Sequence, residues 1–426
     1  MEDAADSGSS LWTMLFAALF TLHMAKYITW IFKLRHINGP FPLPVLGNFY
    51  MSDSLAPTKF IKGLSKKFGK TFTYWPGITP MVVLLDPSHV RQVLTDTRTF
   101  AKGKDYSEKF SQFFGLGLIT SDGAKHKKDR SMLARFFVRT YVESYIPVFN
   151  KQTNNIYGEL IDSLSEKELE EVDVSKHFYD MINRVFFNFF CGADLSATEE
   201  SKEFSRWMNH LFQYGLWFCG ASIIFGFPVF GNPLVVKIKK MKKEFFERFS
   251  PYLDERKKLR AEGGDEPDDC LKVLLDADTT DEDLSDHIIT LIGAGHDTTA
   301  LTLSSAVHLL AKHPETQKKL RDEIKEVMGE RKEVTATDLK NLKYLAMVMK
   351  ETLRMVAVVP FLNRTVTKDI TIGGANRGNK PVFLPKGSTV LMSMSNMHRS
   401  SDVWEDPSEF KPGRSIHLKY VIILYK

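Results

Sequence analysis

An acid and two hydroxyl side chains interrupt an apolar stretch in the second half of the chain. Residues 291–305 read LIGAGHDTTALTLSS, so Asp297, Thr298 and Thr299 have mainly apolar neighbours. Buried polar groups need partners, and the Thr298 hydroxyl can bond back to the carbonyl of Ala294, which bends a helix. The small residues leave room for a flat ligand against the backbone. We interpret the acid and the alcohol as a short proton relay beside that ligand, and the alternative is a kinked core helix with a capped polar pair.

A glutamate and an arginine form the second candidate group. Residues 350–360 read KETLRMVAVVP, in which Glu351 and Arg354 are three apart and share one helix face. Such pairs are common on exposed helices and contribute little there. The apolar neighbours Leu353 and Met355 instead favour a buried pair, which would need further partners.

Two more stretches carry cationic side chains. His126 and Arg130 lie four residues apart in SDGAKHKKDRSMLARFF, residues 121–137, and share a predicted helix face. Arg364 lies in FLNRTVTKDI, residues 361–370, which has strand-like composition. By themselves these residues are typical of a solvated basic helix and of a surface ion pair.

The remaining sequence must position these groups. Helical patterns dominate to about residue 355, and glycine, proline and β-branched residues dominate from there to residue 399. The fold class predicted is therefore mainly α with a small β part. The predicted elements are a helix at 57–68, a hairpin of strands 71–75 and 81–85, helices with short breaks over 138–258, a long helix at 281–312 and a helix opening at Pro314.

Composition excludes some classes of function. The net charge is +5, and the 57 lysines and arginines are interleaved with 52 acids, which argues against nucleic-acid binding. A mild basic excess suits an anionic membrane surface or an acidic protein partner. The three cysteines, Cys191, Cys219 and Cys270, lack CxxC spacing, so neither a disulfide framework nor a zinc site is predicted.

The N-terminal segment is expected to bind a membrane. Residues 11–32 are apolar and nearly long enough to span a bilayer, although His23 and Lys26 interrupt them. Acids precede the segment and basic residues follow it, which places the body of the protein in the cytoplasm. We expect a single-pass anchor in residues 1–36, and the alternative is a cleaved signal peptide.

A second apolar stretch, residues 211–236, is rich in aromatic residues but is broken by Gly and Pro. It is consistent with core, with a loop that dips into a membrane, or with the wall of an apolar pocket. The basic run at 237–243 is typical of a solvated helix face, but beside an apolar loop it also suits an interfacial position.

Taken together and in order, these stretches resemble the cytochrome P-450 haem-thiolate monooxygenases, and the membrane-bound microsomal kind is the closer match. AGHDTT at 294–299 is similar to the family's oxygen-activating helix, and ETLR at 351–354 to its ExxR helix. HRSSDVWEDPSEFKPGR at 398–414 resembles the segment that ends in the arginine joining the Glu–Arg pair. GPFPLPVLGN at 39–48 resembles the proline-rich hinge behind the anchor. The likeness covers residues 37–414.

The resemblance implies roles for the matching positions. Asp297 and Thr298 would deliver protons to dioxygen at the haem, and Ala294 and Gly295 would lie over the haem face. The propionates of haem b would be held by Arg130 and Arg364, whose forked donors suit carboxylates, and by His126. Glu351, Arg354 and Arg414 would form a buried structural network.

It also implies a reaction and partners. The activity would be hydroxylation of a lipophilic small molecule with dioxygen and with electrons from NADPH, delivered by a flavoprotein reductase that docks near Lys125, Lys127 and Lys128. The pocket would be lined by residues 103–119, 216–230, 356–361 and the long helix. The expected location is the endoplasmic reticulum membrane, with the domain facing the cytoplasm.

The C-terminal end departs from the family pattern. Beyond the arginine that matches Arg414 the family has a loop with the cysteine whose thiolate binds iron, then a core helix and strands; here residues 415–426 read SIHLKYVIILYK. We therefore expect an incomplete P-450-like domain at 37–414, followed by an unrelated apolar tail, with no metal ligand. Because thiolate donation favours O–O cleavage, we also expect little activity.

Two other functions fit the same fold. One is a non-catalytic, membrane-tethered lipid- or sterol-binding protein, and the other is an isomerase or dehydratase that works without dioxygen. The acid and alcohol of AGHDTT argue against both, since neither needs that proton relay. A general helical membrane scaffold would have no reason to carry these motifs in order.

Overall fold

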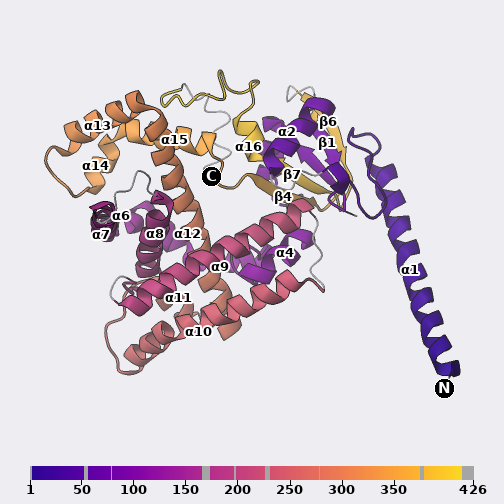
Figure 1. Cartoon of the computed structure of the whole chain (residues 1–426), viewed down its shortest axis with the longest axis horizontal. Coiled ribbons are helices and arrows are strands. Elements are labelled where there is room, and N and C mark those ends of the chain that lie inside the picture. Colours follow the sequence, from indigo (N-terminus) through magenta and orange to yellow (C-terminus); the bar gives the residue numbers. More distant parts are fainter. Residues whose placement is uncertain are drawn as a thin grey trace.

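The computed structural model of the chain describes residues 2–51, 56–77, 79–165, 173–195, 198–225, 231–277, 279–374 and 379–414. These residues form a large helical body, with two small sheets beside it (Figure 1). The predicted fold class, mainly α with a small β part, is confirmed.

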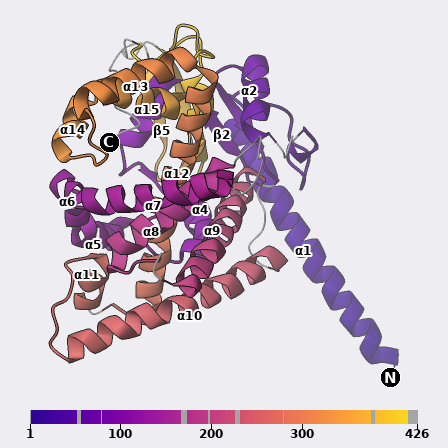
Figure 2. The same cartoon turned by 60° about the vertical axis from the view of Figure 1, so that its left-hand side comes forward.

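The long helix α12 (Asp281–Lys312) runs through the helical body (Figure 1, Figure 2). Its bounds are those that the sequence predicts. Thr280 caps it, because its side-chain oxygen accepts a hydrogen bond from the Asp283 amide, and acids occupy the first turn, where the helix dipole favours negative charge. The helices α8 (Val174–Cys191), α9 (Glu199–Phe225), α10 (Pro233–Ala261) and α4 (Lys104–Phe114) pack around α12 and one another.

The main core lies among these five helices. Its largest members are phenylalanines that are almost fully buried, including Phe113, Phe190, Phe212 and Phe245. The other described helices are α1 (Glu2–Leu34), α2 (Pro57–Phe68), α3 (Pro87–Thr95), α5 (Gly123–Leu133), α6 (Arg139–Ser144), α7 (Ile146–Ser165), α11 (Cys270–Asp276), α13 (Pro314–Met328), α14 (Ala336–Asn341), α15 (Lys343–Met355) and α16 (Met394–His398), with 3-10 turns at Phe49–Met51 and Ala134–Phe137.

The larger sheet has the strand order β1-β2-β7-β4-β3. The predicted hairpin is its first pair, since β1 (Thr71–Tyr74) and β2 (Met81–Leu84) are antiparallel and each ends one residue before its predicted limit. The strands β7 (Thr389–Ser393), β4 (Phe361–Val366) and β3 (Phe100–Ala101) complete it, and β7 lies parallel to β2. The strands β5 (Ile370–Gly374) and β6 (Asn379–Leu384) form a separate antiparallel pair.

Most of the apolar stretch at 211–236 belongs to helix α9. Leu211, Phe212 and Phe218 are buried in the main core, so this part is core and not a loop. Position 215 inside this helix requires a glycine, because a Cβ atom there would lie 2.5 Å from the ring of Phe113. Residues 226–230 lie outside the described part of the chain.

Helix α1 extends away from the body, with the N-terminus at its far end (Figure 1, Figure 2). In the described part of the chain, no helix is both apolar enough and long enough to cross a membrane. The prediction of a spanning segment at residues 11–32 is therefore not supported, and His23 and Lys26 are two polar residues that lower its hydropathy.

The proline-rich segment after α1 is more than a linker. The Thr73 amide donates to the Asn38 carbonyl at 2.8 Å, the Asn48 amide donates to the Trp75 carbonyl at 2.8 Å, and the Tyr27 hydroxyl donates to the Pro42 carbonyl at 2.6 Å. These bonds attach the segment to β1 and to the end of α1. The tail at 415–426, expected to be unrelated to the rest, lies outside the described residues.

Candidate functional site

The acid–alcohol pair lies in the middle of α12. The Thr298 hydroxyl donates to the Ala294 carbonyl at 2.9 Å, which is the back-bond that the residue spacing predicts. Thr302 repeats the pattern, with its hydroxyl donating to the Thr298 carbonyl at 2.7 Å. The O–H donor of each hydroxyl is therefore used within the helix, and its oxygen can still accept a hydrogen bond from another group.

Asp297 has a partner that the sequence does not reveal. The hydroxyl of Tyr179 on α8 donates to the Asp297 carboxylate at 3.0 Å. Burial raises the pKa of Asp297 above its usual range, and the Tyr179 hydrogen bond opposes that rise because it stabilises the ionised form. Tyr179 lies 118 residues away in sequence, so no local pattern could have indicated it.

Asp297 and Thr298 line a cavity of about 500 Å³. The other lining residues come from all four of the predicted segments, and examples are Phe114 from α4, Leu216 from α9 and Val359 after α15. Most of the lining side chains are apolar. The prediction of an apolar pocket between these segments is confirmed by the cavity.

The other AGHDTT residues occupy different sides of α12. Ala294 lines the cavity. Gly295, expected to lie over the haem face, is placed against Phe186 of α8, because a Cβ atom there would come within 2.0 Å of that ring. His296 is fully buried, and its Nε2 lies 2.6 Å from the Asn209 side-chain oxygen. Burial lowers the pKa of His296 to about 3, so the ring is neutral.

Four cationic or ionisable side chains gather near one end of the site. Arg130 and Arg364 both act electrostatically on Lys102, and Lys102 and Arg130 both act on His126. Burial, opposed by Asp122 and reinforced by the two arginines, lowers the pKa of Lys102 to about 8. Burial and the two neighbouring cations lower the pKa of His126 as well.

This cluster brings together α5, β4 and the segment before α4. The Lys102 ammonium donates to the carbonyls of Leu118 and Ser121 at 3.1 and 2.9 Å, and Arg364 lines the cavity. Such a concentration of positive charge beside an apolar cavity fits a flat ligand that carries carboxylates. Lys102 was not predicted from the sequence, because a single lysine in a loop carries no signal of its burial.

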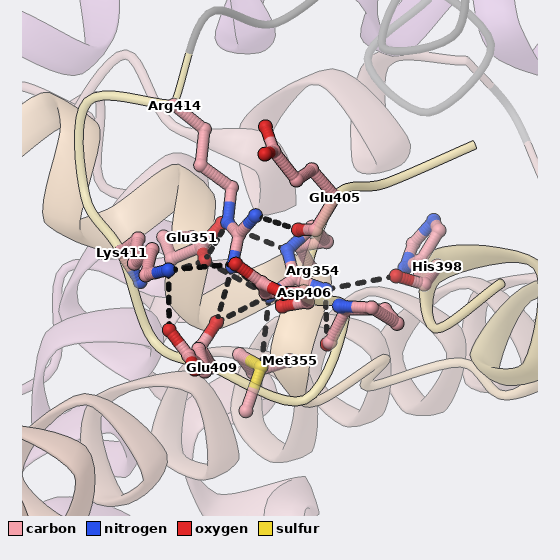
Figure 3. A network of polar contacts seen from close by, with 10 residues as sticks. Glu351, Arg354, Met355, His398, Glu405, Asp406, Glu409, Lys411 and Arg414 are labelled. Carbon is pink, nitrogen blue, oxygen red and sulfur yellow. Dashed lines mark hydrogen bonds and ion pairs between the residues drawn. The ribbon is translucent and has the colours of Figure 1, made fainter. Parts of the chain in front are cut away.

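The predicted glutamate–arginine group is brought together as a buried network (Figure 3). The Arg354 guanidinium binds the Glu351 carboxylate through two hydrogen bonds, of 2.8 and 2.9 Å. Arg414 adds a third at 3.0 Å, and the Lys411 amide a fourth, also at 3.0 Å. The two charges of the first pair are nearly inaccessible, with side chains 6% and 4% exposed.

Arg354 also organises the chain that follows the small sheet. It donates to the carbonyls of His398, Pro407 and Glu409, each at 2.9 Å. Its guanidinium lies 5.2 Å from the centre of the Trp404 ring. Arg354 and Glu351 together therefore hold residues 398–414 against α15 (Figure 3).

The three cysteines lie elsewhere. Cys191, Cys219 and Cys270 are unpaired and buried in the main helical core. Burial raises the pKa of Cys191 to about 12 and raises those of the other two thiols, which leaves all three protonated. None is among the described residues that line the cavity. The cavity and the cations fit the face and carboxylates of a haem, whereas no described residue fits the role of its thiolate ligand.

Comparison with known proteins assigns the family. The family model described as "Cytochrome P450" matches residues 37–415. The chain is 28% identical over 444 residues to cytochrome P450 3A11 of Mus musculus, which covers 96% of this chain and 82% of that protein. It is 26% identical over 431 residues to the probable cytochrome P450 508A1 of Dictyostelium discoideum, covering 94% and 85%. It is 27% identical over 444 residues to cytochrome P450 4F12 of Homo sapiens, covering 95% and 82%.

Proposed function

This chain belongs to the cytochrome P450 family, and we propose that its cavity binds a lipophilic small molecule for hydroxylation beside Asp297 and Thr298. Family membership makes it an oxidoreductase of the haem-thiolate monooxygenase type. The observation that carries the proposal for this chain is the acid–alcohol pair at the edge of an apolar cavity.

The residues for holding haem are those of the cationic cluster and of α12. Arg130, Arg364, Lys102 and His126 would bind the two propionates, and Ala294 would lie against the face. When bound, haem supplies the activation of dioxygen by its iron, with electrons from a reductase.

Two residues of the chain, Thr298 and Asp297, would transfer the protons that the reaction consumes. The Thr298 hydroxyl is held in place by the Ala294 carbonyl and can pass a proton on while accepting another. The Asp297 carboxyl, whose pKa burial raises, can reload with a proton nearer neutral pH than an exposed aspartate can. The apolar walls exclude water from the reacting centre.

The substrate is a lipophilic molecule because the cavity offers few polar groups. At about 500 Å³ the cavity is of the size that takes drug-sized or lipid-like ligands. A sterol, a terpenoid or a fatty acyl chain would each suit such walls.

Lys127 and Lys128 are the proposed contacts for an acidic flavoprotein reductase. Both are exposed on α5, next to the cationic cluster. Lys125, also expected there, is instead paired with Asp129 and Asp283 at 3.3 and 3.0 Å, so its charge is partly neutralised.

Membrane association is proposed for α1. It exposes large apolar side chains, and these are Met14, Phe20, Leu22, Ile28 and Phe32. Exposed apolar surface of this extent marks contact with lipid or protein, and we propose the cytoplasmic side of the endoplasmic reticulum membrane. Flotation with phospholipid vesicles tests it, since replacement of Phe20 and Leu22 by glutamate should release the chain from the vesicle fraction.

The absorption spectrum of the reduced, haem-loaded chain with carbon monoxide tests the haem site. Because all three cysteines lie in the helical core, we expect residues 1–426 to give the band of haem without thiolate ligation and little hydroxylated product with NADPH and reductase. A red-shifted, thiolate-type band with product formation would overturn that expectation. Haem uptake that weakens in Arg364→Leu supports the proposed site.

Lipophilic ligand binding without any haem uptake would instead favour the non-catalytic lipid- or sterol-binding function. Conversion of a hydroperoxide without incorporation of dioxygen would favour the isomerase or dehydratase. Mass spectrometry with labelled dioxygen separates these outcomes, and Thr298→Ala is the control for the proton relay.

A further inference from the structure

An apolar stripe lies on the C-terminal half of α12. Its members follow the i, i+4, i+7, i+8 spacing of one helix face, and they are Leu303, Val307, Leu310 and Ala311. Val307 is 39% exposed, Ala311 is exposed as well, and the two leucines are only partly buried. None of the four lines the cavity. The described residues therefore leave this face of α12 open to water.

The stripe connects the open edges of two hydrophobic clusters. Leu303 packs against the cluster that contains Met181 of α8. Leu310 packs against a second cluster, which contains Val348 of α15. Val307 lies between these two edges on the same helix face. An apolar segment placed over Val307 would therefore join the two clusters into one continuous core.

The last described residues lie beside this stripe. Phe410 is buried in the second cluster, and the centre of its ring lies 5.2 Å from that of His313, the residue that follows α12. Four residues later, the Arg414 side chain donates to the Glu351 carboxylate of α15 at 3.0 Å. Because α15 packs against α12, the chain beyond Arg414 begins near the C-terminal end of the stripe.

The residues that follow Arg414 are apolar and numerous enough to cover it. Residues 415–426 read SIHLKYVIILYK and include the uninterrupted apolar run YVIILY at 420–425. Withdrawal of such a run from water is favourable. From Leu303 to Ala311 the stripe is about 12 Å long at the rise of an α-helix. The twelve residues after Arg414 can span up to about 40 Å, so their length permits this contact.

We propose that residues 415–426 pack on the α12 stripe and cover Val307, so that the chain's own C-terminal segment completes the core between the two clusters. A second copy of the chain or a phospholipid surface could also cover an apolar face. The nearby attachment at Arg414 favours residues 415–426, because a tethered segment has a high effective concentration at the face beside it. The stripe lies outside the cavity, so the proposal is independent of the proposed function.

The first measurement is disulfide trapping in the full-length chain. Val307→Cys is combined with Val421→Cys, Ile422→Cys or Ile423→Cys in turn, and each chain is oxidised with copper phenanthroline. In the control, Val236→Cys on α10 replaces Val307→Cys, because Val236 is even more exposed, at 69%. For at least one tail position, most of the monomeric chain should form an internal disulfide with Val307→Cys and little should form one with Val236→Cys. Non-reducing electrophoresis and peptide mass spectrometry measure both.

Three outcomes of this measurement would overturn the proposal. Equal or greater trapping with Val236→Cys would show that the segment has no preference for the stripe, and no trapping at either position would show that it does not reach Val307. A disulfide that forms only between two chains would assign the stripe to a second copy. Protection of Val307→Cys from a water-soluble maleimide only when phospholipid vesicles are present would assign it to a lipid surface.

The second measurement is a double-mutant cycle in thermal unfolding. Val307→Asp should lower the Tm by about 2 °C or more, whereas Val236→Asp should leave it unchanged. Ile422→Asp should also lower the Tm, and the loss in the double variant Val307→Asp/Ile422→Asp should be smaller than the sum, because each aspartate alone breaks the same contact. Additive losses, or no loss from Val307→Asp, would contradict the proposal. Neither measurement uses haem, ligand or turnover, so a failure here leaves the proposed function as it stands.

Discussion

The hydroxyl of Tyr179 on α8 donates a hydrogen bond of 3.0 Å to the carboxylate of Asp297 on α12. This bond ties the acid of the cavity to a helix that lies behind it. Tyr179 is half-buried, and burial followed by the charge of Asp297 raises its pKa, so the phenol stays protonated and remains a donor. Tyr179 is therefore a positioning residue for Asp297 in the proposed proton relay.

Tyr179→Phe should raise the pKa of Asp297. The change removes the one interaction that opposes the effect of burial on this carboxyl, so the group should protonate at a higher pH than in the wild type. Isotope-edited infrared titration of the aspartate carboxyl bands, with Asp297→Asn to assign the signal, measures the shift. Tyr214→Phe is the control, because the Tyr214 hydroxyl has no partner among the described residues, and an equal shift in that variant would contradict the interpretation.

Two glycines of α9 should respond to alanine in opposite directions. Gly215→Ala places a methyl group 2.5 Å from the Phe113 ring and should destabilise the chain by about 1–3 kcal/mol. Gly220→Ala meets no atom within 4 Å and should stabilise it by about 0.5–1 kcal/mol through the reduced entropy of the unfolded chain. Urea unfolding of both variants tests the pair, and a stabilising Gly215→Ala would show that α4 packs elsewhere.

Glu351→Gln should destabilise the chain severely. It leaves the buried Arg354 and the partly buried Arg414 without their carboxylate, and breaking a buried ion pair in this way costs about 3–5 kcal/mol. Circular dichroism during urea unfolding measures the loss. Lys318→Ala breaks the exposed pair with Asp322 and should leave the unfolding midpoint unchanged. A similarly small effect of Glu351→Gln would mean that the network is accessible to water.

Lys102 should make the stability of the chain depend on alkaline pH. Its folded pKa of about 8 lies below the value of 10.5 for an ordinary lysine, so between these values the unfolded chain binds more protons and stability rises with pH. The rise in urea midpoint from pH 7.5 to 9.5 should be smaller in Lys102→Met than in the wild type. If the two chains show the same rise, the ammonium is not desolvated at this position.

The sequence predicts the elements better than the contacts between them. The bounds of α12 follow from a capping threonine, an acidic first turn and Pro314 after its end, all of which are local signals. The back-bond of Thr298 is local too. Tyr179 and Lys102 join the site through long-range packing of α8 and of the segment before α4, which no local pattern encodes.

Three residues make packing or charge contacts that the sequence does not reveal. Gly215 lies inside α9 without interrupting it, and it makes room for the Phe113 ring. Gly295 packs against Phe186, so its lack of a side chain serves contact between helices. Lys125, which looks like part of a free basic patch, is neutralised by acids on its own helix and on α12.

Arg354 donates hydrogen bonds to three backbone carbonyls, and these bonds affect how residues 398–409 unfold locally. Residues 398–409 contain few regular backbone hydrogen bonds of their own, and the two guanidinium groups of Arg354 and Arg414, both bound to Glu351 of α15, donate to several of their carbonyls. The segment should therefore detach as a whole rather than fray residue by residue. In hydrogen–deuterium exchange its amide protons and those of α15 should be released together, as a single cooperative unit.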